Sequence, residues 1–131
     1  MSKERIKVVS AAIVSQGKYL ITQRAAKAVL PHLWEFPGGK IEAGETKEAA
    51  LKRELKERLC VDVEVHEVIS HTEKEYDKYI VELSLFNCAL ITGQEPQVGN
   101  IEQFAWASTD ELGNFEFTPA DQQSMDALLG S

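Results

Sequence analysis

The sequence lacks any long apolar run, and this absence limits where the protein can act. No stretch of the chain approaches the ~18 consecutive apolar residues that a membrane-spanning helix needs. The opening residues, MSKERIKVV, contain no apolar segment flanked as in a signal peptide. Cysteine is also scarce, because Cys60 and Cys88 are the only two and match no metal-binding spacing. We therefore expect a reduced, cytoplasmic protein with no membrane partner.

Positive charge is in short supply as well. The 14 Lys and Arg residues face 21 Asp and Glu residues, the net charge is −7, and no basic block follows the chain. A nucleic-acid binder needs such a block to neutralise phosphates, so the composition argues against a nucleic-acid partner. A small polyanion can still bind where a few arginines or divalent cations gather.

The pattern of apolar residues indicates one domain over residues 1–131, without repeats or linkers. It predicts strands at Ile6–Val14, Lys18–Thr22, Val61–Val68, Tyr79–Ile91 and Ile101–Ala107, a long loop at Arg24–Pro37, and helices starting after Thr46 and Thr118. Met125, Leu128 and Leu129 are expected to dock the last helix. This order predicts an α/β fold, with a mixed, partly antiparallel sheet sandwiched between helices.

The stretch ALKRELKERLC predicts an amphipathic helix with an unusual charged face. Leu51, Leu55 and Leu59 form one apolar stripe, and we expect Ala50, Arg53, Glu54 and Glu57 on roughly the opposite side. The simplest interpretation is a solvated surface, on which the i,i+4 pairs Glu54–Arg58 and Arg53–Glu57 each contribute ~0.2–0.5 kcal/mol.

A longer pattern gives these charges another meaning. From Gly39, the chain has five residues, Glu45, seven residues, and then Arg53-Glu54-Leu55-x-Glu57. This resembles the signature of the Nudix hydrolases, G-x5-E-x7-R-E-U-x-E-E-x-G-U, where U is a bulky aliphatic residue. The segments ITQRAA and LWEFPGGKIEAGET are similar to the MutT-like branch, which hydrolyses nucleoside triphosphates. The resemblance implies a Nudix fold over nearly the whole chain and a divalent cation, Mg²⁺ or Mn²⁺.

Carboxylate oxygens are the ligands that these hard cations prefer. Glu54 and Glu57 lie three residues apart on one helix face, so both are expected to hold the metal and to help deprotonate the attacking water. Gly39 permits a tight turn whose carbonyl can approach the same ions. Arg53 is expected to orient the carboxylates, and Glu45 to brace the loop with it.

Arg24 and Glu35 are further candidates in the segment before the motif. A guanidinium grips phosphate oxygens bidentately, so Arg24 is expected to contact the substrate phosphate. The alternative is an exposed loop arginine. Glu35 is a candidate accessory ligand of the metal or of the loop.

The chain departs from the family pattern at three positions. Arg58 stands in place of the second paired glutamate, and Cys60 in place of the helix-ending glycine. Asn100, six residues before Trp106, stands where the MutT-like branch has a further metal-binding glutamate; Glu102 is a nearby candidate substitute.

Two of these departures leave alternatives open. Arg58 repels a metal ion, and it can instead bind a substrate phosphate or pair with Glu54. Cys60 either keeps the left-handed backbone that glycine would adopt, with strain, or is extended with a buried thiol.

Asp121, in TPADQ, is the candidate base-binding residue. At this position, oxidised-guanine enzymes of the branch resemble one another in having asparagine, and cytidine-preferring relatives have aspartate. A carboxylate accepts a hydrogen bond from the cytosine amine. The alternative is a capping box, Thr118-x-x-Asp121, at the start of the last helix. Tyr76 and Tyr79 can stack on a base or pack on the sheet.

The resemblance implies hydrolysis of a nucleoside triphosphate, of cytidine type or with an oxidised purine, to the monophosphate and pyrophosphate. Two alternatives remain open: a nucleotide-binding domain with weakened catalysis, and a hydrolase of another nucleoside diphosphate derivative such as a nucleotide sugar. The expected partner is a small nucleotide, and the protein is expected to be a monomer or a homodimer.

Overall fold

The computed structural model describes residues 3–128, and their side chains as far as residue 123. In chain order the elements are β1 (Glu4–Ser15), β2 (Lys18–Gln23), β3 (Trp34–Glu35), β4 (Gly38–Lys40), α1 (Lys47–Leu59), β5 (Val63–Glu75), β6 (Tyr79–Leu90), β7 (Gln103–Ala107), the 3-10 turn η1 (Leu112–Asn114) and α2 (Pro119–Leu128). None of the helices in this part of the chain is long and apolar enough to cross a bilayer.

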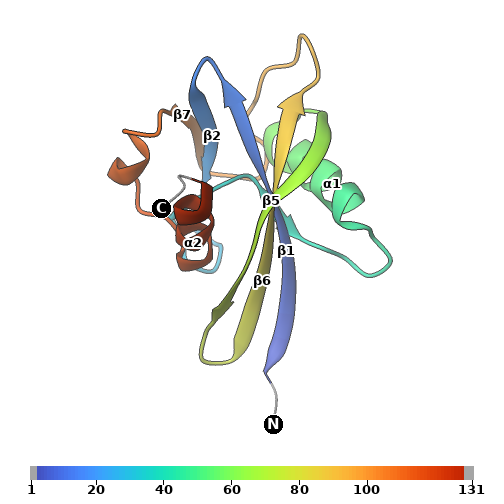
Figure 1. The fold of residues 1–131 in the computed structure, drawn as a ribbon, viewed down its shortest axis with the longest axis vertical. Helices are drawn as coiled ribbons and strands as arrows, with labels where there is room; N and C mark the ends of the chain where they lie inside the picture. Colours follow the sequence, from blue (N-terminus) through green and yellow to red (C-terminus); the bar gives the residue numbers. More distant parts are fainter. Residues whose placement is uncertain (1–2, 129–131) are drawn as a thin grey trace.

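The seven strands form a mixed sheet in the order β3-β2-β1-β6-β5, with β4 also paired to β1 and β7 to β2. β1 and β6 are parallel from Glu4–Tyr79 to Ile13–Cys88, and the other pairings are antiparallel. The second edge of β1 is shared, because β4 pairs with Val8–Ser10 and β2 with Val14–Ser15. In Figure 1, β1, β5 and β6 therefore continue together toward the N-terminus while β2 and β7 diverge from them.

Alternation along β1 places a core on each face of the sheet. Val9, Ala11 and Ile13 pack in one cluster with the leucines of α1, and Ala12 packs in the other with Phe36 and neighbours from β6 and the last third of the chain. α2 contacts β5 and β6, and Figure 1 shows the two helices on opposite sides of the sheet. The predicted mixed sheet between helices is confirmed.

α1 begins as predicted, but its buried face is wider. Thr46 is the N-cap, and its hydroxyl accepts a hydrogen bond from the Ala49 N–H at 3.1 Å. The expectation that Ala50 and Glu54 lie on the solvent side is wrong, since their exposed fractions are 0% and 7%. The reason is that β4 packs on α1 beside the leucine stripe, so a second row of helix positions is covered.

Two other expectations differ from the structure. β5 continues to Glu75 instead of ending at Val68, because register shifts between Val65 and Ser70 break the alternation that indicated the strand. The loop Arg24–Pro37 contains the short strand β3, which pairs with the end of β2. The docking of Met125, Leu128 and Leu129 concerns side chains outside the described part of the chain.

Cys60 has the left-handed backbone that a glycine adopts freely. Its φ is 60° and its ψ is 33°, its N–H donates to the Lys56 carbonyl at 3.1 Å, and the residue is exposed. The prediction of a left-handed helix end is confirmed, and the extended alternative with a buried thiol is wrong. A cysteine in this conformation is destabilised by roughly 1–2 kcal/mol relative to glycine.

We therefore predict that Cys60→Gly stabilises the protein by about 1 kcal/mol, by relief of the left-handed strain. Chemical unfolding with the thiols kept reduced measures the effect. Cys60→Ala is the matched control, because alanine keeps the Cβ and should gain little. A lower unfolding midpoint for the glycine variant would contradict the strain argument.

Candidate functional site

A cavity of about 550 Å³ collects side chains from both ends of the chain. Its charged lining includes Lys40 and Glu42 and a group that we call the charged wall, which consists of Arg24, Glu35, Glu54 and Arg58. Its apolar wall is formed by Ile6, Val8, Tyr76, Tyr79 and Val81, and Gly38, Gly39 and Asp121 also line the cavity. Six of the predicted site residues thus share one space: Gly39, Arg24, Glu35, Glu54, Arg58 and Asp121.

Arg53 connects the loop before α1 to the carboxylates on the helix. Its Nε and Nη2 donate to the two oxygens of Glu45 at 2.7 and 2.9 Å, and Nη2 also donates to the Lys40 carbonyl at 3.0 Å. Its Nη1 donates to Glu54 Oε2 at 3.0 Å. Hydrogen bonds from Arg53 first, and then from the Glu42 N–H, lower the pKa of Glu45 to about 2. Arg53 and Glu45 are paired as a brace would be, and their contribution to catalysis stays a prediction.

The Glu54 carboxylate is packed against the backbone of β4. Its side chain is 9% exposed, and a Cβ added to Gly39 would lie 2.3 Å from Glu54 Cδ and 2.4 Å from Oε1. A side chain at position 39 would therefore displace the Glu54 carboxylate from the place where Arg53 and Arg58 hold it. The second oxygen of Glu54, Oε1, accepts a hydrogen bond from Arg58 Nε at 3.0 Å.

Arg24 and Glu35 form a second pair on the charged wall. Arg24 Nη1 donates to Glu35 Oε1 at 3.1 Å, and its Nε donates to the Val29 carbonyl at 2.6 Å. The side chain of Arg24 is 24% exposed, so the alternative of an exposed loop arginine is wrong. Burial raises the pKa of Glu35, and the charges of Arg24 and Arg58 oppose that rise.

Other predicted residues lie outside the lining of this cavity. The Glu57 side chain is 48% exposed and meets Arg53 Nη1 at 3.4 Å. Asn100 and Glu102 are both exposed, and the Glu102 backbone N–H donates to the Gln23 carbonyl at 3.0 Å. Glu57 is thus at the margin of the site, one guanidinium away from Glu54. Metal ligation by Glu57 and Glu102 stays a prediction.

Asp121 is 6% exposed and joins α2 to the segment between β3 and β4. Its Oδ1 accepts from the Phe36 N–H at 3.0 Å, and its Oδ2 accepts from the Thr118 hydroxyl at 2.7 Å. The Thr118 N–H donates instead to the Trp34 carbonyl at 3.0 Å, so the reciprocal hydrogen bonds of a capping box are not formed, although the carboxylate does meet the start of the helix at the Thr118 hydroxyl. Burial first, and then the charge of Glu35, raise the pKa of Asp121 to about 7.

The donors around Glu54 fit a hard divalent cation. The expectation of a tight turn at Gly39 is wrong, because this glycine lies in the extended strand β4. Its backbone approaches the Glu54 carboxylate without an intervening side chain, and Arg53 connects that carboxylate to Glu57. Oxygen ligands of this kind suit Mg²⁺ and Mn²⁺. Arg58 is the one departure, because it places a cation within hydrogen-bonding distance of the same carboxylate.

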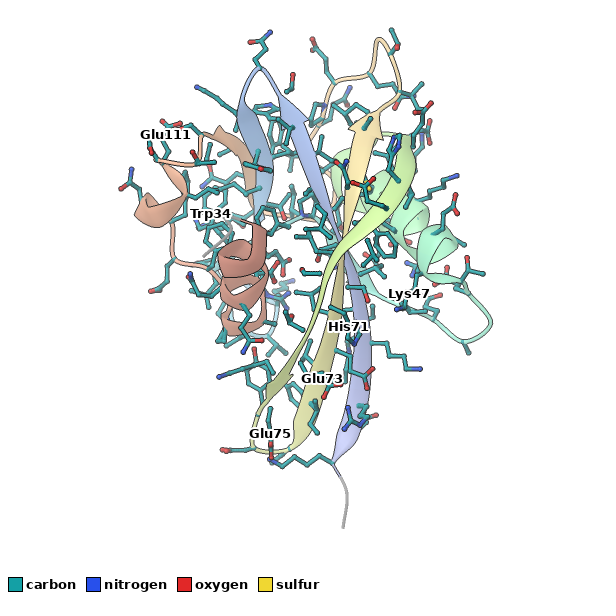
Figure 2. All side chains as sticks on the ribbon, in the orientation of Figure 1. Trp34, Lys47, His71, Glu73, Glu75 and Glu111 are labelled. Carbon is teal, nitrogen blue, oxygen red and sulfur yellow. The ribbon has the colours of Figure 1, made fainter. Side chains whose placement is uncertain are left out.

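A second group of metal-capable side chains lies on the strands, away from this cavity. His71 and Glu73 of β5 and Glu82 of β6 have ligand atoms within 4.8 Å of one another, and Figure 2 labels the first two. Arg5 Nη1 donates to Glu73 at 3.1 Å and to Glu82 at 3.0 Å. The two facing carboxylates already share a cation, so we interpret the group as an ion-pair network of the sheet.

Comparisons with known proteins identify the family of this chain. Residues 9–127 match the model of the NUDIX domain. The chain is 33% identical to the CTP pyrophosphohydrolase of Escherichia coli K12, over 95% of this chain and 91% of that protein. It is 32% identical to the 8-oxo-dGTP diphosphatase of Haemophilus influenzae, over 98% and 95% of the two chains. The solution structure of the E. coli ORF135 protein superposes with a TM-score of 0.82, at 31% identity, covering 97% and 90%.

The chain therefore belongs to the Nudix family, and the predicted family, fold class and enzyme class are confirmed. What sequence reasoning missed is the aliphatic part of the apolar wall, since only Tyr76 and Tyr79 were named as candidates for contact with a base. Ile6 and Val8 were assigned to a strand, and their spacing of two residues shows that they share a face. Nothing in the sequence says that this face borders the cavity.

The close approach of Gly39 and Glu54 gives a testable expectation. Gly39→Ala should destabilise the protein by about 1–3 kcal/mol, because the new Cβ overlaps the buried carboxylate. Thermal or urea unfolding measures the cost. Gly113→Ala is the matched control, since nothing lies within 4 Å of a Cβ at that glycine. The cost should shrink in the background Glu54→Ala, and an undiminished cost there would refute the overlap.

Proposed function

We propose that this enzyme hydrolyses a nucleoside triphosphate to the monophosphate and pyrophosphate, with Mg²⁺ or Mn²⁺. The observation that carries the proposal is that a single cavity joins a charged wall of two arginines and two glutamates to an apolar wall with two tyrosines and a buried aspartate. The first wall suits a polyphosphate and the second suits a base. The names of the relatives, a CTP pyrophosphohydrolase and an 8-oxo-dGTP diphosphatase, support the same substrate class.

Within this proposal, each charged residue has a separate task. Arg24 binds phosphate oxygens through its guanidinium, which is already held at the cavity wall by Glu35. Glu54, or Glu57 at the margin, accepts the proton of the water that attacks phosphorus in line. Arg53 keeps both carboxylates in place. When bound, the divalent cation neutralises charge that develops on the phosphate oxygens.

For the base, we propose a site between the tyrosines and Asp121. The rings of Tyr76 and Tyr79 have centroids 5.1 Å apart and are tilted by 32°, and both line the cavity. The cavity volume of about 550 Å³ is within the range of small-molecule sites and favours a single nucleotide. In this proposal, Asp121 distinguishes a cytidine-type base from an oxidised purine. The cellular role would be sanitation of the nucleotide pool.

Cytoplasmic location is part of the same proposal. Both cysteines are free, as expected in a reducing compartment. The expected state of monomer or homodimer stays a prediction.

A product screen tests the proposed reaction. Cytidine triphosphates, 8-oxo-dGTP and nucleotide sugars are incubated with the protein and Mg²⁺ or Mn²⁺, and pyrophosphate and orthophosphate are measured separately. Pyrophosphate release from a triphosphate, without orthophosphate, supports the proposal. Turnover of nucleotide sugars alone would favour the third alternative, and tight nucleotide binding without turnover would favour a binding domain.

The metal assignment gives a second prediction. Glu57→Gln keeps the size of the side chain and removes its charge, so the rate should fall by about two orders of magnitude or more with little loss of stability. The matched control is Glu48→Gln, which removes an exposed glutamate paired with Lys52 on the same helix and should leave the rate unchanged. Near-normal turnover of the Glu57 variant would return this residue to a solvated surface.

The assignment of Asp121 to base binding gives a further prediction. Asp121→Asn should change the preference between cytidine triphosphate and 8-oxo-dGTP by about 1–3 kcal/mol, the value of one good base contact. The ratio of the two kcat/KM values measures it. An unchanged ratio together with a changed unfolding midpoint would leave Asp121 a purely structural role.

The pH dependence of the stability of the same variant tests whether the pKa of the buried Asp121 carboxyl is raised. Because the folded-state pKa is raised from 3.8 to about 7, the folded state binds the proton more tightly than the unfolded state does. Wild-type stability should therefore lose this contribution as the pH rises through that range, and the loss should persist above it. Asparagine does not titrate, so the stability of Asp121→Asn relative to wild type should increase over the same interval. Unfolding at pH 5 and pH 8 compares the two.

A further inference from the structure

Arg58 makes only one of the hydrogen bonds that its side chain offers. Its Nε donates to Glu54 Oε1 at 3.0 Å, while its two terminal amino groups have no hydrogen-bond partner among the described residues. The side chain is 22% exposed and belongs to the charged wall of the cavity. A guanidinium that lines a cavity and has donors to spare is suited to an anionic ligand.

The position of this guanidinium is fixed from both sides. Arg58 and Glu54 are one helical turn apart, and Glu54 is itself held by Arg53. The Arg58 carbonyl accepts a hydrogen bond from the Gly99 N–H at 2.8 Å, so the loop before β7 holds the backbone of the helix end. The charges of both Arg58 and Arg24 act on Glu35, so the two guanidinium groups face the same part of the cavity. The side chain therefore needs little reorganisation to meet a ligand.

We propose that Arg58 binds the polyphosphate of the substrate directly through its terminal amino groups, while its Nε stays on Glu54. For the substrate class this rests on the proposed function. A carboxylate that holds a divalent cation carries the same net single positive charge as one guanidinium. Arg58 thus supplies, as a fixed side chain, the charge that a metal-loaded glutamate would supply at this point of the helix.

The competing interpretation is that Arg58 merely blocks a cation from Glu54. Each carboxylate oxygen has two lone pairs, so one hydrogen bond on Oε1 leaves acceptor capacity for a metal. Glu54 also has a guanidinium partner in Arg53 without Arg58. Blocking gives no role to the terminal amino groups on the cavity wall, whereas anion binding does.

Binding of inorganic tripolyphosphate in the presence of EDTA tests the proposal without metal or turnover. Calorimetry on the full chain should show binding to wild type, and Arg58→Gln should weaken it about tenfold or more. Arg58→Lys should be intermediate, because lysine keeps the charge and loses the fork. The matched control is Lys56→Gln, which removes the same charge from the same helix turn, where Lys56 is 60% exposed and pairs with Asp62 at 3.5 Å. It should change the affinity by no more than about twofold.

Two outcomes would overturn the proposal. One is that wild type does not bind tripolyphosphate in EDTA, and the other is that Arg58→Gln and Lys56→Gln bind tripolyphosphate with equal affinity. In the second case, a tighter affinity of free Arg58→Gln for Mn²⁺ would identify Arg58 as a competitor of the metal. Thermal melting of each variant confirms that it is folded. Because pyrophosphate release is measured separately, a failed nucleotide screen with intact Arg58-dependent anion binding would sink the proposed reaction and not this inference.

Discussion

Burying the carboxylate of Glu54 is the constraint around which the site is organised. A carboxylate removed from water is costly unless charged partners meet its oxygens, and here each oxygen has its own guanidinium, from Arg53 and from Arg58. Arg53 reaches back to Glu45 and Lys40, so the same pairing fixes the loop before α1. The position of one buried charge thus accounts for the small residue at Gly39 and for the arginine that precedes the glutamate.

The carboxyl of Asp121 is also buried, but its hydrogen-bond donors are uncharged groups instead of guanidinium groups. Its carboxyl accepts hydrogen bonds from a backbone N–H and a hydroxyl, and Glu35 adds a negative charge nearby. The pKa of Asp121 is raised to about 7, so the protonated and ionised forms of this carboxyl are both populated near neutral pH. The two environments divide the cavity into a part that compensates charge and a part that offers directed hydrogen bonds. This division matches the two halves of a nucleotide.

The sequence predicted best those features that follow from spacing or from backbone rules. The motif spacing placed Glu54, Arg53 and Gly39 together, and the left-handed end at Cys60 followed from the position of a family glycine. Burial of Glu54 was missed, because the helical wheel shows one apolar stripe and cannot show that β4 covers a second face. The direction of the Arg58 guanidinium was also open, since it depends on which carboxylate accepts its Nε. Glu57 shares the spacing of Glu54 and still lies at the margin, so spacing alone does not establish ligation.

The departures from the Nudix pattern at Arg58 and Asn100 are neighbours in space, although 42 positions separate them in the sequence. The N–H of Asn100 donates to the Glu57 carbonyl at 3.2 Å, and the next loop amides back along the chain donate to Arg58 and Leu59. The loop seals the end of α1 through its backbone, so the side chain at position 100 is not needed for that contact. At neither position does this chain have the carboxylate of the pattern that it resembles, and Arg58 adds a positive charge at this helix end. A fixed positive charge at the cavity wall is what the proposed contact between Arg58 and a substrate phosphate requires.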